Sequence, residues 1–109
     1  TLSWSFYYLA KNKQIQEKIY DELVEKFGNL NLVQPKHKQN LPYTEAFINE
    51  ILRLSSTQPL IPRSTQANVK IGEYTIPKDT TILLNAYAIH RDEKYWPKPD
   101  ELRPERWLD

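Results

Sequence analysis

The 109 residues carry 15 lysines and arginines against 14 aspartates and glutamates, which gives a formal net charge of +1. This near balance provides no basic surface for nucleic acid and no attraction to an anionic membrane. The absence of cysteine excludes disulfides, zinc–thiolate sites and a thiol nucleophile within these residues. The longest apolar run is shorter than the roughly 20 residues of a membrane span, and no signal-peptide pattern is present. We interpret both ends as cuts through a longer protein.

Two helices are predicted at the start of the chain. Residues 1–10 are apolar nearly all round, which is typical of a buried helix end. Residues 13–27 are amphipathic, with apolar side chains at every fourth position and charges on the opposite face. Asn12 is a candidate N-cap of the second helix, and Gly28 is a candidate left-handed C-cap.

A polar stretch and a third helix follow. Residues 29–41 predict an exposed loop, in which His37 lies between two lysines and is expected to be solvated. The third helix is predicted from Pro42, a good first-turn residue, to about Leu54. Neither His37 nor His90 has the i, i+4 partner of a metal-binding helix, so no metal site is expected.

The second half of the chain predicts small sheets and an irregular end. Prolines exclude a regular helix through residues 56–63. Residues 66–85 contain a hairpin signal around Gly72 and one further strand. Residues 86–109 begin with a short helix and continue as a proline-rich meander with at most one helical turn. The sequence therefore predicts a mainly α chain with small β-sheets, an α+β class, that forms a single partial domain.

The predicted third helix carries a glutamate inside its apolar stripe. Projected at about 100° per residue, Glu50 falls within the stripe and Arg53 falls at its edge. A surface ion pair is one interpretation, but a carboxylate that faces the core must be paired, since its desolvation is costly. Arg106 is the candidate second donor, because its planar guanidinium can grip a carboxylate while charged. Glu50, Arg53 and Arg106 are therefore predicted to form one buried network.

These segments together resemble the cytochrome P-450 family of heme-thiolate monooxygenases. The resemblance rests on E-x-x-R in "LPYTEAFINEILRL", residues 41–54, followed by "AIHRDEKYWPKPDELRPERW", residues 88–107. The resemblance covers essentially the whole chain. The sequence is more similar to the animal microsomal members of the family than to the soluble bacterial ones. The resemblance implies a C-terminal-half segment of that fold, in which residues 1–10 end the long central helix.

The resemblance also implies roles for individual residues. Glu50 and Arg53, with Arg106, match the family's structural lock near the proximal heme face, and Trp107 stands where Phe is usual. Arg63 matches a position that commonly binds a heme propionate, although from the residues alone a solvent-facing charge is the alternative. The segment just before it matches a stretch that lines the substrate pocket: Gln58, Pro59, Leu60 and Ile61.

No catalytic residue and no metal ligand is expected within the chain. The family's heme-ligating cysteine has no counterpart here, and Thr1 does not match the catalytic threonine, which lies about one helical turn upstream. The intact protein is expected to bind heme b through a cysteine outside the chain and to receive electrons from NADPH through a reductase. We expect a small lipophilic organic substrate and an N-terminal membrane anchor. The endoplasmic reticulum is the expected location, with a mitochondrial membrane as the alternative, and the isolated chain should be inactive.

Two other functions remain open at this stage. A heme-thiolate isomerase or dehydratase would act on a peroxide without external electrons, and would lack the acid–alcohol pair upstream of Thr1. A stand-alone α+β interaction domain would use the glutamate–arginine network for structure alone, and would unfold in one cooperative transition.

Overall fold

The structure, a computed structural model, describes residues 1–28 and 40–108. The predicted loop at 29–41, with His37, lies outside the described residues except for its last two positions. Leu41 departs from the prediction of an exposed loop, because its side chain is only 8% exposed. It is also the residue at which the third helix is capped, so the chain enters the core before that helix begins.

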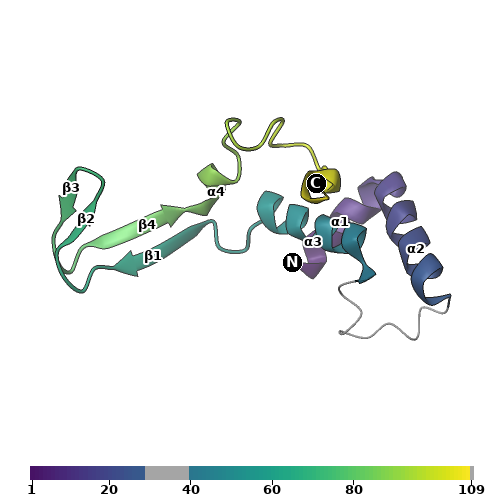
Figure 1. Ribbon diagram of the computed structural model, residues 1–109, viewed down its shortest axis with the longest axis horizontal. Coiled ribbons are helices and arrows are strands. Elements are labelled where there is room, and N and C mark those ends of the chain that lie inside the picture. The colour runs from purple at the N-terminus through teal and green to yellow at the C-terminus, as the bar shows by residue number, and fades with distance from the viewer. Residues whose placement is uncertain (29–39, 109) are drawn as a thin grey trace. The chain divides into compact units, whose positions relative to one another are not determined.

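The described elements are helices and short strands (Figure 1). The α-helices are α1 (Leu2–Lys11), α2 (Lys13–Phe27), α3 (Pro42–Leu54) and α4 (Ala86–Ile89), and the 3-10 helix is η3 (Pro104–Trp107). The strands are β1 (Leu60–Ser64), β2 (Val69–Ile71), β3 (Tyr74–Ile76) and β4 (Thr81–Asn85). Helices with two small antiparallel sheets confirm the predicted α+β class. The chain divides into two compact units, Thr1–Thr57 with Asp100–Asp109, and Gln58–Pro99.

The first unit contains a small apolar core beneath α3. Pro42 occupies the first turn of this helix, where a missing N–H costs nothing. The helix packs against η3, α2 and α1, and its amphipathic pattern places one stripe inward. Among the described residues of this unit, the apolar side chains below a tenth exposed are Leu41, Ala46, Phe47, Ile51, Leu54 and Pro104.

The junction between α1 and α2 differs from the predicted capping. The Asn12 side chain makes no cap hydrogen bond to α2; its amide donates instead to the Tyr8 carbonyl at 2.8 Å and closes α1. Gly28 has φ of 60° at the end of α2, a conformation that favours glycine. In α1, Leu2 and Phe6 are 74% and 68% exposed. The predicted burial of this helix is therefore not found within the described chain.

The second unit holds both sheets. Strand β1 pairs with β4, from Leu60 opposite Asn85 to Ser64 opposite Thr81, and β2 pairs with β3 across the turn at Gly72 (Figure 1). The sheet region thus begins earlier than the predicted residue 66. A proline inside β1 obscured this strand in the sequence, yet each strand of a two-stranded sheet has an open edge where proline is tolerated.

Thr65 is the buried polar centre of the second unit, with 7% exposure. Its hydroxyl donates to the Pro77 carbonyl at 2.7 Å and accepts from the Thr80 N–H at 2.9 Å. Its backbone N–H also donates to the Thr80 carbonyl at 3.0 Å. These bonds tie the end of β1 to the segment between β3 and β4.

Candidate functional site: a buried carboxylate lock

Glu50 lies at the centre of the buried face of α3 and is 0% exposed. One turn later, Arg53 is 2% exposed and grips the carboxylate with two bonds. Its Nε donates to Oε2 at 2.9 Å and its Nη2 donates to Oε1 at 2.8 Å. This is the bidentate geometry in which a guanidinium matches a carboxylate best. The surface ion pair that the helix alone allowed is therefore excluded.

The turn η3 supplies the opposite side of the Glu50 site. The Nε of Arg106 donates to Glu50 Oε1 at 3.3 Å, slightly longer than the roughly 2.7–3.2 Å of an ordinary N–H···O bond. The backbone N–H of Arg103 donates to the same oxygen at 3.1 Å. Glu50, Arg53 and Arg106, which were predicted to form one network, thus lie in contact around one carboxylate, although Arg106 is 56 residues from Glu50 in the chain.

Two donors to Glu50 escaped sequence reasoning. The indole Nε1 of Trp107 donates to Oε2 at 2.9 Å, and the Arg103 N–H comes from the backbone. Phe is usual at the position of Trp107 in the family that the sequence resembles. Because Phe has no polar group, the resemblance gave no indication of this hydrogen bond. The signal that could have found it is the indole N–H itself, a donor that seeks an acceptor when partly buried, one residue after the arginine of the network.

Competing effects set the charge of Glu50. Burial raises the pKa of its carboxyl, but the hydrogen bonds from Arg53, Trp107 and the Arg103 N–H outweigh burial and hold the pKa below its ordinary value of 4.5. The carboxylate is therefore ionised at neutral pH, and both of its oxygens accept hydrogen bonds from fixed donors. The Glu50 carboxylate therefore holds structural elements together and is badly placed to take a proton from a substrate. This arrangement suits a structural role.

A second carboxylate, Glu22 of α2, caps the start of α3. Its Oε1 accepts from the Tyr43 N–H at 2.7 Å, and its Oε2 accepts from the Thr44 N–H at 2.9 Å and the Thr44 hydroxyl at 2.6 Å. These N–H groups have no partner inside the helix, and the positive end of the helix dipole favours a negative charge there. Sequence reasoning missed this contact because the cap comes from another helix.

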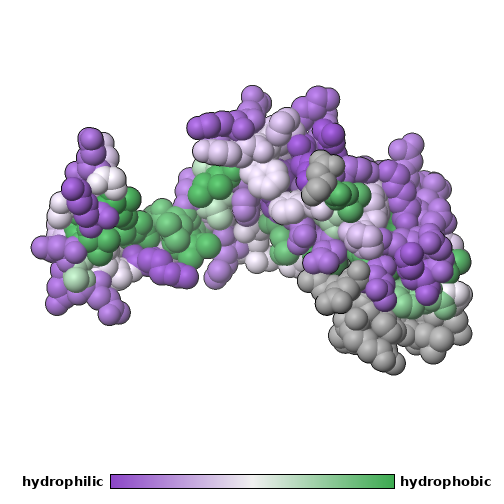
Figure 2. Space-filling model, viewed as in Figure 1, coloured by the Kyte–Doolittle hydropathy of each residue, from purple (hydrophilic) through white to green (hydrophobic). Residues whose placement is uncertain are grey.

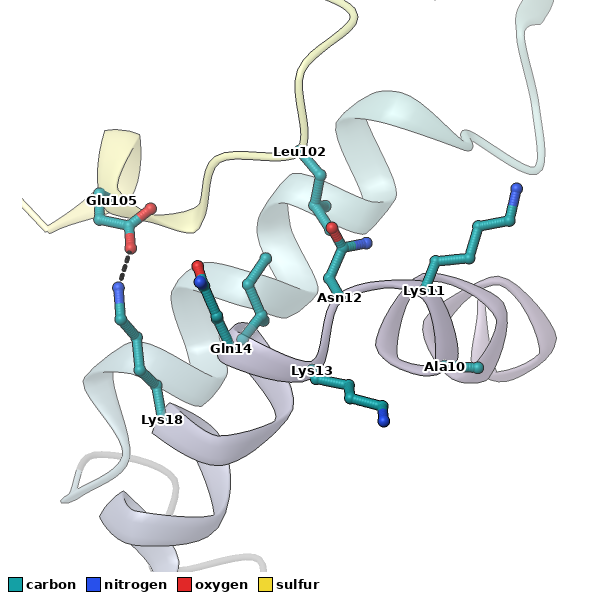
Figure 3. Close-up of a pocket in the computed structure, with 9 residues that line it drawn as sticks. Ala10, Lys11, Asn12, Lys13, Gln14, Lys18, Leu102 and Glu105 are labelled. Atoms are coloured by element: carbon teal, nitrogen blue, oxygen red, sulfur yellow. Dashed lines mark hydrogen bonds and ion pairs between the residues drawn. The ribbon is translucent and has the colours of Figure 1, made fainter.

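A hollow of about 560 Å³ lies beside the α1–α2 junction (Figure 3). Its lining includes Lys11, Lys13 and Lys18 from the helices and Glu105 from η3. Figure 3 shows Glu105 reaching from η3 to the Lys18 ammonium, and the two groups are 2.7 Å apart. Among residues 1–28 and 40–108, no group of three or more acidic, histidine or cysteine side chains is placed to hold a metal ion.

The other residues singled out in the sequence belong to the second unit. Arg63 lies in β1 with an exposed side chain, and its Nη1 donates to the neighbouring Pro62 carbonyl at 2.8 Å. In the segment before it, Gln58, Pro59 and Leu60 are exposed and Ile61 is half-buried. The Pro59 carbonyl accepts from the Tyr87 N–H at 3.1 Å, which joins this segment to α4. None of the helices in the described chain is long and apolar enough to cross a membrane.

The E-x-x-R helix and the P-E-R-W turn, on which the resemblance to heme-thiolate proteins rests, therefore meet at one buried carboxylate. The family model for cytochrome P450 matches residues 1–109, and the chain belongs to this family. The predicted resemblance to the cytochrome P-450 family is thereby confirmed.

Individual relatives show how much of such a protein the chain represents. It is 42% identical to a steroid 17-alpha-hydroxylase/17,20 lyase of Ictalurus punctatus and 38% identical to a probable cytochrome P450 of Dictyostelium discoideum, with 99% of the chain covered in each case. A zebra fish cytochrome P450 structure with abiraterone superposes with a TM-score of 0.94 and 32% identity, over 99% of this chain and 27% of that one. The chain spans about a fifth of the length of these curated relatives. Arabidopsis thaliana proteins match at similar identity, so the likeness extends beyond animal members.

Proposed function

We propose that the chain is part of a heme-thiolate monooxygenase that inserts one oxygen atom of O2 into a lipophilic organic substrate. The observation that carries this proposal is the match of the family model to all 109 residues, including the Glu50 site. Electrons would come from NADPH through a reductase, and the enzyme would be held at the endoplasmic reticulum membrane by an N-terminal anchor. We also infer that the two units belong to one larger domain of the parent protein.

In this proposal the Glu50 site is a structural lock. Arg53 and Arg106 neutralise a carboxylate that would otherwise be costly to bury, and in return the carboxylate fixes η3 on α3. In this role the lock takes no part in the chemistry. Its contribution is a rigid support for the heme-binding part of the fold, since a cofactor enzyme depends on how precisely the protein holds its cofactor.

Arg63 is the residue of this chain that we propose to hold the heme. Its guanidinium is exposed on β1, and its donors fit a propionate carboxylate in charge and geometry. A thiolate ligand to the heme would have to come from outside these 109 residues, which contain no cysteine. Heme held in this way, with a thiolate ligand, would supply the oxygen-activating chemistry of the enzyme.

The substrate class is proposed only as lipophilic. Relatives named as steroid 17-alpha-hydroxylase/17,20 lyase support this class. The proposed pocket segment, Gln58, Pro59, Leu60 and Ile61, fits this class as well, because three of its four side chains are apolar.

The test uses the full-length protein encoded by the parent gene. It should show a thiolate-type spectrum with carbon monoxide after reduction and should oxidise a lipophilic substrate only with NADPH and a reductase. Arg63→Ala should lower heme retention at unchanged helix content. Arg63→Lys should restore only part of the retention, because an ammonium is a point charge and cannot donate the two parallel hydrogen bonds of a guanidinium. Lys70→Ala, an exposed lysine of β2, is the matched control.

Two results would contradict the proposal. A thiolate-type spectrum combined with turnover of a peroxide and no need for electrons would indicate the isomerase or dehydratase. Equal heme retention in the wild type and both Arg63 variants would refute the propionate role of Arg63 while leaving the reaction class intact.

A further inference from the structure

Two charged residues of α2 hold the two elements that meet at Glu50. Lys18 and Glu22 are four residues apart, so they lie on the same face of the helix. Glu22 accepts the N–H groups at the start of α3. Lys18 donates to Glu105 Oε1 of η3 at 2.7 Å. One face of α2 thus contacts both halves of the lock without touching Glu50 itself.

Tyr43 connects these two contacts. Its backbone N–H donates to Glu22 Oε1 at 2.7 Å, and its phenol hydroxyl donates to Glu105 Oε1 at 3.1 Å. The Lys18 ammonium lies 5.3 Å from the centre of its ring, within the range of a cation–π contact. Tyr43 therefore joins the start of α3 to η3 at a point away from the buried carboxylate.

The charge states of these groups support the same arrangement. Burial raises the pKa of the Glu105 carboxyl, but hydrogen bonds from Lys18 and Tyr43 are among the effects that outweigh it and lower the pKa below 4.5. The pKa of Tyr43 is raised, by burial first and then by the Glu105 charge, so its phenol keeps the proton that it donates. At neutral pH, donor and acceptor are thus in the states that the contact needs.

We propose that these contacts form a second polar latch, which positions η3 so that its next residues reach Glu50. We call it the α2 latch, and its members are Lys18, Glu22, Tyr43 and Glu105. Because Glu105 directly precedes Arg106 in a single tight turn, fixing its carboxylate fixes the orientation of that turn. The latch residues are positioning residues, and their effect reaches the lock through Arg106 and Trp107.

The Trp107 indole is the reporter that separates positioning from general stability. In the full-length protein labelled with 5-fluorotryptophan, the Trp107 fluorine resonance is assigned by its loss in Trp107→Phe. Tyr43→Phe and Lys18→Met should each shift or broaden this resonance. Lys26→Met is the matched control, because Lys26 lies on the same helix and pairs with the adjacent Glu25; it should leave the resonance in place.

Heme retention provides the second readout, and it alone rests on the proposed function. Lys18→Met should release heme about two- to fivefold faster than wild type, a modest factor because Lys18 and Glu105 are partly exposed. In a Trp107→Phe background, Lys18→Met should add less than this factor, because the two residues act through the same turn.

Each outcome decides a different point. An unchanged Trp107 resonance in both Tyr43→Phe and Lys18→Met would overturn the latch, as would fully independent effects of Lys18→Met and Trp107→Phe on heme release. If wild-type protein binds no heme, the proposed function fails, and the fluorine measurement still tests the latch by itself.

Discussion

The two units of the chain differ in what they bury at their centres. In the first, the apolar side chains on the inward stripe of α3, such as Phe47 and Ile51, and the Glu50 carboxylate are almost completely enclosed. In the second, large apolar side chains of the strands remain exposed, for example Leu83 at 58% and Leu84 at 48%. Figure 2 shows hydrophobic surface over the region of β1 and β4.

This contrast shows where each unit obtains its stability. The first unit combines a small core with charge-assisted hydrogen bonds, which are about twice as strong as neutral ones. The second unit depends on two short ladders and the neutral hydrogen bonds of Thr65. An isolated two-stranded hairpin is at best marginally stable in water. Substitutions in the first unit should therefore cost more than comparable substitutions in the second.

The largest effect is expected at Glu50. In the full-length protein, Glu50→Ala should lower the free energy of unfolding by about 3–5 kcal/mol, because it strands two arginine side chains that were buried with a partner. The yield of heme-loaded protein should collapse. Glu73→Ala, at the exposed turn of the second unit, is the control for chemical denaturation. Normal stability and yield of the Glu50 variant would end the claim that a lock exists.

A smaller loss is expected at Trp107. Trp107→Phe keeps an aromatic ring but removes a hydrogen bond to a charged group, and should cost about 2 kcal/mol while the protein still folds. Denaturation midpoints should fall in this variant and stay nearly constant in Trp4→Phe, an exposed indole of α1. If both variants behave alike, the indole N–H contributes nothing beyond ring packing.

The counterpart in the second unit is Thr65. Thr65→Val keeps the shape but leaves the Pro77 carbonyl and the Thr80 N–H without this hydroxyl, and should cost about 1 kcal/mol. Thr75→Val, on an exposed position of β3, should change stability very little. A loss at Thr65 as large as that at Glu50 would reverse the comparison between the units.

The smallest effect concerns acid and Glu105. Because the folded-state pKa of Glu105 is lowered, its stabilising contribution is present above about pH 4.5 and is lost as the pH falls through the lower folded value. With 41% of the side chain exposed, we expect less than about 1 kcal/mol at pH 7. The unfolding free energies of wild type and Glu105→Gln should differ at pH 7 and converge as the pH falls below 4.5. A difference that persists or grows in acid would show that ionisation of Glu105 is irrelevant.

Local patterns in the sequence determined most of the secondary structure. Helical periodicity gives α2 from Lys13 to Phe27, and Pro42 marks the start of α3. Gly72, with φ of 60°, marks the turn between β2 and β3. These features depend on backbone geometry within a few residues, so they can be read without knowing the fold. Strand β1 escaped because Pro62 argues against a strand unless the pairing edge is known.

The sequence by itself also determined that Glu50 faces inward and needs a cationic partner, since a helix repeats every 3.6 residues and a lone buried carboxylate is too costly. Only the tertiary structure decided which donors reach it. The Arg103 N–H is a group that every non-proline residue possesses, and the Trp107 indole could have faced solvent. The tertiary structure also decided that Glu22 caps α3, a helix other than its own. Such contacts join segments far apart in the chain, and their geometry is fixed by packing, which no local pattern encodes.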